Sequence, residues 1–167
     1  TLSVWVKRAN LGTRQQIYSN KTASSSFSAM NMYFNASNDR LYIDHHDGSS
    51  NLSLYTTQVF RDVSAWYHIV HTIDTTTATA TNRLRLYVNG TEVTDFATDN
   101  NPSQNADLAI TNSTGDQSIG DDPRDSNDLF DGYMAEFNFV DGTTLDPTYF
   151  GETNSDGIWV PKEPVSY

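Results

Sequence analysis

Six aspartates that lie close together are the residues of this chain best suited to metal chemistry. They are Asp116, Asp121, Asp122, Asp125, Asp128 and Asp131, and Arg124 is the one basic side chain between them. Calcium takes six to eight oxygen ligands, commonly from carboxylates and carbonyls in irregular loops. We therefore expect the first five to be candidate ligands of a calcium ion. The alternative is a solvated loop whose carboxylates repel one another.

A second polar cluster, Asp44-His45-His46-Asp47, combines imidazole and carboxylate groups, which suit zinc and similar ions. Side chains of adjacent residues in a strand point to opposite faces. Asp44 and His46 therefore share a face, and at most these two could hold one ion. The alternative is a polar strand end that precedes a turn.

Carboxylates and histidines that could catalyse a reaction are present, but their spacing does not suit catalysis. Retaining glycoside hydrolysis needs two carboxylates about 5 Å apart. Asp131 and Glu136 come nearest to such a pair, yet they point to opposite faces of a regular strand. His68 and His71 diverge in the same way, and no Gly-x-Ser-x-Gly nucleophile motif occurs. We therefore expect no enzymatic activity, and a carboxylate pair formed by distant strands is the alternative that stays open.

The aromatic side chains offer a different chemistry, the stacking of sugar rings. A core does not need all of Tyr33, Tyr42, Tyr55, Tyr87, Tyr133 and Trp159. Together with the polar cluster they predict a ligand-binding surface made by Tyr42, Asp44, His46, Tyr55 and Tyr87. The alternative is that most of these rings are packed, as we expect for Trp5 and Trp66.

The composition bounds the function further. The chain has 167 residues, no cysteine and a formal charge of −11, and no segment approaches the ~18 apolar residues of a membrane span. Disulfides, thiol catalysis and cysteine-held metals are excluded. Nucleic acid is not an expected partner, because its phosphates require clustered Lys and Arg. The charge is uneven, since residues 1–92 carry eight basic and six acidic side chains and residues 93–167 carry two basic and fifteen acidic.

Strands must position these residues, because apolar residues alternate along the chain and no window keeps helical spacing. The expected strands cover residues 2–6, 16–19, 30–34, 40–45, 52–59, 66–74, 83–88, 117–120 and 130–140. We expect a hairpin over 40–59, a central strand at 66–74 and a type I′ turn at Asn89-Gly90. One short helix is expected near residues 146–151, capped by Asp146. The predicted fold class is all-β, an antiparallel β-sandwich of the jelly-roll type.

Five pieces of the sequence, in order, carry a family resemblance. The chain resembles the laminin-G-like, concanavalin A-like jelly-roll domains in Trp66-Tyr-His-Ile-Val, Arg83-Leu-Arg-Leu-Tyr-Val-Asn-Gly and Phe130-Asp-Gly-Tyr-Met-Ala-Glu-Phe. It is similar to the version found in virion proteins of tailed, particularly marine, phages in Val4-Trp-Val-Lys-Arg-Ala-Asn-Leu-Gly and Phe150-Gly-Glu-Thr-Asn-Ser-Asp-Gly-Ile-Trp-Val-Pro-Lys. Such relatives usually carry one more strand at each end. The resemblance therefore implies that residues 1–167 are a single domain, truncated at both ends.

The resemblance also implies a function. It implies a non-enzymatic carbohydrate-binding or adhesion domain of a phage virion, in a tail fibre, spike or capsid fibre, that recognises a glycan on the host surface. This places the protein on the virion, outside cells, with other virion proteins as partners and a homotrimer as the expected assembly. Laminin-G-like domains commonly bind calcium at a rim of the sandwich, in keeping with the acidic residues above. The alternative is a purely structural decoration or assembly module that contacts other virion chains.

Overall fold

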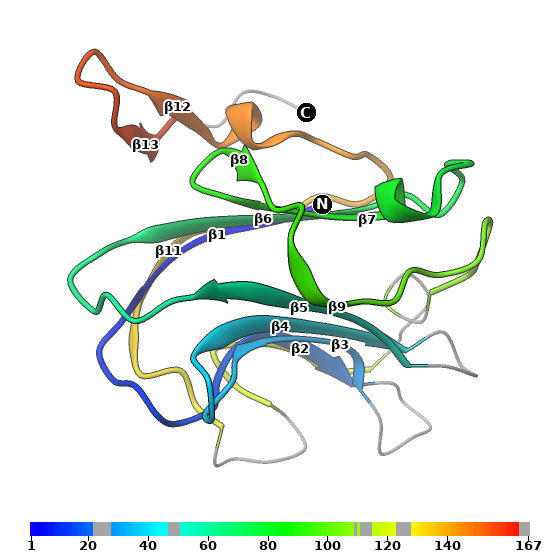
Figure 1. Ribbon diagram of the computed structural model, residues 1–167, viewed down its shortest axis with the longest axis horizontal. Coiled ribbons are helices and arrows are strands. Elements are labelled where there is room, and N and C mark those ends of the chain that lie inside the picture. Colours follow the sequence, from blue (N-terminus) through cyan, green and yellow to red (C-terminus); the bar gives the residue numbers. More distant parts are fainter. Residues whose placement is uncertain (22–27, 47–50, 109, 111–114, 123–127, 164–167) are drawn as a thin grey trace.

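Antiparallel strands make up most of the chain, as the sequence predicts. The computed structural model describes residues 1–21, 28–46, 51–108, 110, 115–122 and 128–163 (Figure 1). A five-stranded sheet has the order β11 (Gly132–Phe139), β1 (Leu2–Arg8), β6 (Tyr67–Ile73), β7 (Leu84–Val88) and β8 (Thr91–Glu92). Strand β6 lies at its centre, which confirms the prediction for residues 66–74.

A six-stranded sheet packs against the first. Its order is β10 (Gln117–Ile119), β2 (Gln15–Lys21), β3 (Ser28–Phe34), β4 (Arg40–His46), β5 (Asn51–Val59) and β9 (Phe96–Asp99). The predicted hairpin over residues 40–59 is confirmed, because β4 and β5 are antiparallel neighbours. Two sheets of antiparallel strands, face to face, make the predicted jelly-roll sandwich.

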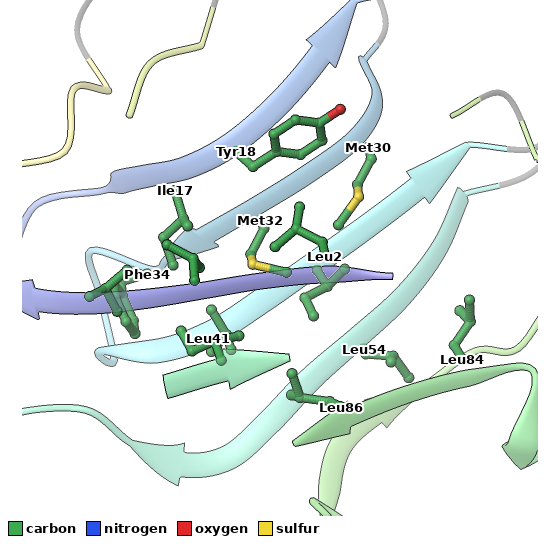
Figure 2. Close-up of a cluster of buried hydrophobic side chains, with 14 of the residues drawn as sticks. Leu2, Ile17, Tyr18, Met30, Met32, Phe34, Leu41, Leu54, Leu84 and Leu86 are labelled. Carbon is green, nitrogen blue, oxygen red and sulfur yellow. The ribbon is translucent and has the colours of Figure 1, made fainter. Parts of the chain in front are cut away.

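The core lies between the two sheets and follows from the two-residue period of a strand. Alternate residues of each strand point inward, so that β3 buries Met30, Met32 and Phe34 and β7 buries Leu84 and Leu86. Figure 2 shows these side chains meeting side chains of other strands in the space between the ribbons. Each fully buried apolar side chain of this size contributes about 1.5–3 kcal/mol. The core is therefore the main source of stability.

The turn at Asn89-Gly90 confirms the type I′ prediction. Both residues have positive φ, 48° at Asn89 and 79° at Gly90, as this turn requires. The side-chain oxygen of Asn89 also accepts the backbone N–H of His68 at 2.8 Å, which ties the turn to the central strand.

Residues 140–162 cover the outer face of the five-stranded sheet as a third layer, seen above that sheet in Figure 1. They contain the strand pair β12 (Gly151–Thr153) and β13 (Trp159–Pro161). The ring of His68 lies between those of Trp5 and Trp159, with centroid distances of 4.7 and 6.0 Å, and Trp159 Nε1 donates to His68 Nδ1 at 2.9 Å. A Cβ atom added at Gly90 or Gly151 would lie 2.7 or 2.6 Å from the Trp159 ring, so both glycines make room for the indole.

Three details differ from the sequence predictions. The helix expected at 146–151 is a single 3₁₀ turn, η2 (Pro147–Tyr149), because β12 begins at Gly151; Asp146 caps it as predicted, accepting the Thr148 N–H at 2.8 Å. A second 3₁₀ turn, η1 (Ala80–Asn82), was not expected. Trp66 is 40% exposed rather than packed, since it lies just before β6 begins.

Within the described residues, no helix is long and apolar enough to span a membrane.

Two histidines meet inside the core. His45 of β4 and His71 of β6 are almost fully buried, and their Nε2 atoms lie 2.8 Å apart. His71 Nδ1 lies 2.8 Å from the carbonyl oxygen of Arg85, so that nitrogen carries a proton. His71 Nε2 then accepts from His45 Nε2–H, and His45 Nδ1 is left unprotonated and without a partner among the described residues. The pair joins the two sheets in its neutral form.

Acid should destabilise the fold through this pair. Burial lowers the pKa of His71 to about 4, and burial together with the nearby His71 lowers the pKa of His45. An unfolded histidine has a pKa near 6.5, so between about pH 6.5 and 4 the unfolded chain binds protons that the folded chain does not. The free energy of unfolding is therefore flat above this window and falls as the pH is lowered through it, by about 3 kcal/mol for His71.

Urea denaturation at a series of pH values from 4.5 to 7.5 measures this fall. The variant His71→Gln lacks the titrating group, so its unfolding free energy should depend less steeply on pH between 5 and 6.5, whatever its overall stability. An unchanged slope would show that His71 does not carry the effect.

Candidate functional site

The outer face of the six-stranded sheet gathers three tyrosines into one row. Side chains along a strand alternate between its two faces. Met32, Ile43 and Leu54 point inward, so the residues next to them in the sequence point outward. The register pairs Tyr33 of β3 with Tyr42 of β4, and Tyr42 with Tyr55 of β5. Directly paired residues have their side chains side by side on one face. Three rings from three strands therefore stand next to one another.

The rings stack along the row. Tyr42 and Tyr55 are nearly parallel, with centroids 3.8 Å apart and an angle of 12°, and Tyr33 is tilted by 53° with its centroid 5.5 Å from that of Tyr42. The guanidinium carbon of Arg14 lies 3.8 Å from the centroid of the Tyr33 ring, a cation–π contact. We call these four side chains, Arg14, Tyr33, Tyr42 and Tyr55, the tyrosine row.

Asp44 accepts the hydroxyl groups of two of the three tyrosines. Its Oδ2 accepts the hydroxyl of Tyr33 at 3.0 Å, and its Oδ1 accepts those of Ser53 at 2.9 Å and Tyr55 at 2.8 Å. The pKa values of Tyr33 and Tyr55 are raised, first by burial and further by the negative charge of Asp44. Both phenols are therefore neutral donors at physiological pH. A carboxylate has about four lone-pair positions, and three of them are filled here.

Arg14 is held at the other end of the row by acidic side chains. Its Nε lies 3.2 Å from Asp128 Oδ2, and its Nη2 lies 4.0 Å from Asp122 Oδ2. Nη2 also lies 3.4 Å from Gln16 Oε1, and Gln16 in turn donates to Asn31 Oδ1 at 3.2 Å. The charge of Arg14 is thus balanced locally by two carboxylates.

The structure brings together three of the five predicted ligand residues. Tyr42, Asp44 and Tyr55 lie in one cluster on the outer face. His46 lies two residues beyond Asp44 on the same strand, but its side chain is outside the described part of the chain. Tyr87 belongs to β7 of the other sheet and packs beside the cluster of Val70, Leu145 and Phe150, so it stands apart from the row.

Three members of the site, Tyr33, Ser53 and Arg14, were not among the five expected ligand residues. Tyr33 was expected only as a ring that a core does not need. Ser53 could have been found, because it is paired with Asp44 in the predicted hairpin. Arg14 gives no such signal, since it precedes β2 and reaches Tyr33 through the folded chain.

The predicted calcium ligands take different positions. Asp122 and Asp128 face Arg14, the backbone carbonyl of Asp116 accepts the N–H of Lys21, and Asp125 lies outside the described residues. In the part of the chain that the structure describes, no three His, Asp or Glu side chains gather as a metal-binding group. The buried Oδ1 of Asp121, which has no hydrogen-bond partner there, is the feature that fits a cation best. Calcium binding stays a prediction.

Thermal denaturation with added calcium tests that prediction. A cation that binds only the folded chain raises its stability, so millimolar calcium should raise the melting temperature and Asp121→Asn should reduce the rise. Magnesium at the same concentration controls for ionic strength. No shift with calcium would rule the site out.

A hollow lies between the sheets at one end of the sandwich. Its volume is about 550 Å³, and Leu2, Ile73, Leu108 and His71 are among the residues that line it. Both ring nitrogens of His71 are already engaged. Asp74, Asp107 and Asp141 also line the hollow, but among the described residues no aromatic row accompanies them there. We therefore place the candidate site on the tyrosine row.

Two antiparallel sheets packed face to face define a β-sandwich. The family model of the concanavalin A-like lectin/glucanases superfamily, of the laminin G type, matches residues 1–147, and the chain belongs to this superfamily. A comparison with curated proteins finds no significant match.

Solved structures share the fold at low sequence identity. The carbohydrate-binding module (CBM40) of the Ruminococcus gnavus IT-sialidase, bound to α2,3-sialyllactose, is 15% identical with a TM-score of 0.54, over 81% of this chain and 70% of that one. The same module bound to α2,6-sialyllactose is 13% identical with a TM-score of 0.55, over 78% and 70%. The native heptameric SAP-like pentraxin of Limulus polyphemus is 20% identical with a TM-score of 0.51, over 81% and 61%.

Proposed function

We propose that the chain is a non-enzymatic carbohydrate-binding domain and that the tyrosine row, together with Asp44, is its binding surface. The observation that carries the proposal is that the carboxylate of Asp44 holds the hydroxyls of Tyr33, Ser53 and Tyr55 beside a row of stacked rings. Aromatic faces beside fixed polar groups suit a sugar, which presents C–H faces and hydroxyls together. The row is fixed before a ligand arrives, which lowers the entropy cost of binding.

Tyr55 is the ring best placed to stack against a sugar. Tyr42 has Tyr33 on one side and Tyr55 on the other, and Tyr33 has Arg14 and Tyr42. Tyr55 ends the row, and its neighbour on the far side is Thr98 of β9, a small residue. The ring of Tyr55 would separate a sugar on that side from Asp44 of β4. Only a sugar hydroxyl that extends past the edge of the ring would meet the remaining lone-pair position of Asp44.

The same arrangement supports a binding role rather than hydrolysis. Three of the four lone-pair positions of Asp44 are taken by donors on the six-stranded sheet. Glu136 lies on β11 at the edge of the other sheet, with Asp131 just before that strand begins. Glycoside hydrolysis requires two carboxylates close together. Neither Glu136 nor Asp131 lies where it could form such a pair with Asp44.

Replacing Tyr55 tests the proposal. The variant Tyr55→Ala removes the stacking ring, and we expect it to weaken binding to the glycans that the wild-type protein recognises on an array by about tenfold or more. The matched control is Tyr133→Ala, which removes a tyrosine that is 63% exposed on the other sheet. Circular dichroism verifies that both variants are folded.

The control should bind as the wild-type protein does. Equal losses in the two variants, or full binding by Tyr55→Ala, would place the site elsewhere. A wild-type protein that binds no glycan would contradict the proposed function itself.

We further propose that the domain belongs to a phage virion, where it acts outside cells as a host-attachment module and assembles as a trimer. This rests on the resemblance of residues 4–12 and 150–162 to phage virion proteins. The alternative is a structural module that contacts other virion chains. In that case the assembly would cover the tyrosine row, whereas an attachment module would leave it exposed.

Light scattering and footprinting of the tyrosines separate these possibilities. We expect a mass of three chains, with Tyr55 accessible to the footprinting reagent. A trimer in which Tyr55 is protected would favour the structural alternative, and a monomer would contradict the trimeric fibre.

A further inference from the structure

The charges around the tyrosine row decide which sugars it can accept. Arg14 is the basic member of the row, and Asp128 and Asp122 lie 3.2 and 4.0 Å from its guanidinium nitrogens. Asp44 adds a third carboxylate on the same face. Two carboxylates thus balance the charge of Arg14 and the third adds to the negative charge of the face, so the arginine has little attraction left for an anionic ligand.

Asp44 also sets the direction of the hydrogen bonds. An ionised carboxylate accepts hydrogen bonds and cannot donate them. Its remaining lone-pair position therefore needs a donor, which a sugar hydroxyl supplies and a ligand carboxylate does not. A ligand carboxylate placed there would meet a like charge at close range, which disfavours binding.

The rest of the molecule reinforces this local charge. The formal charge of the chain is −11, and residues 93–167 account for the acidic excess. Asp122 and Asp128, which come from this acidic part, lie against the row. The summed field therefore repels anions as they approach, and salt screens this repulsion.

We infer that the tyrosine row selects uncharged glycans and excludes glycans that carry a carboxylate, such as sialylated ones. The inference rests on the proposed function and names the class of sugar that the surface takes. It separates this chain from the Ruminococcus gnavus module of similar fold, which was solved with sialyllactose. Fold similarity at 15% identity is therefore a poor guide to the ligand here.

Matched pairs of glycans test the inference. The probes are neutral glycans and their sialylated forms, including lactose with α2,3- and α2,6-sialyllactose, measured by calorimetry at 50 and 500 mM NaCl. We expect each neutral glycan that binds to do so about tenfold more tightly than its sialylated form at low salt, with a smaller difference at high salt. Equal or tighter binding of the sialylated forms would overturn the inference while leaving the proposed function intact. No binding to any probe or arrayed glycan would overturn both.

A charge-neutralising variant tests the local cause. Asp128→Asn keeps the size of the side chain and removes one of the charges that balance Arg14, so it should raise the affinity for sialylated glycans relative to neutral ones about threefold. The matched control is Asp156→Asn, which changes the net charge equally at an exposed residue between β12 and β13. The same change in both variants, or in neither, would show that the charges beside Arg14 do not set the selectivity.

Discussion

The register between strands β3, β4 and β5 is the constraint on which the rest of the molecule depends. Because side chains alternate with a period of two, one register fixes both the core and the outer face. The pairing that buries Met32, Ile43 and Leu54 also places Tyr33, Tyr42 and Tyr55 side by side. A slip of one residue would expose the core and bury the tyrosines. Stability and the proposed binding surface thus share one cause.

Polar contacts across the interior hold the two sheets in a fixed relation. Besides the His45–His71 pair, Arg8 of β1 is fully buried, and it donates to the carbonyl oxygen of Phe60 at 2.7 Å and to Asp39 at 3.1 Å. Buried polar groups are costly unless they are paired, so each contact favours one arrangement of the sheets. Apolar packing supplies most of the stability, and these few bonds define how the sheets are placed.

Much of the fold could be predicted from the sequence, because alternation and turn residues are local signals. Asn89-Gly90 is an example, since the turn chemistry of two residues determines the hairpin. The site was only partly predictable. Tyr42, Asp44 and Tyr55 lie on a single predicted hairpin, whereas Arg14 meets Tyr33 through the tertiary fold. Tyr87 shares the outward orientation of the others but lies on a different sheet, and sheet membership is not a local property.

The docking of Trp159 in the space left by Gly90 and Gly151 gives the sandwich two unequal sides. One broad face is occupied by the chain's own C-terminal residues, and the other carries the tyrosine row. In an assembly that packs the covered faces inward, every copy would display its row outward. Single weak sugar contacts would then combine into strong attachment through avidity, without any change in the individual site.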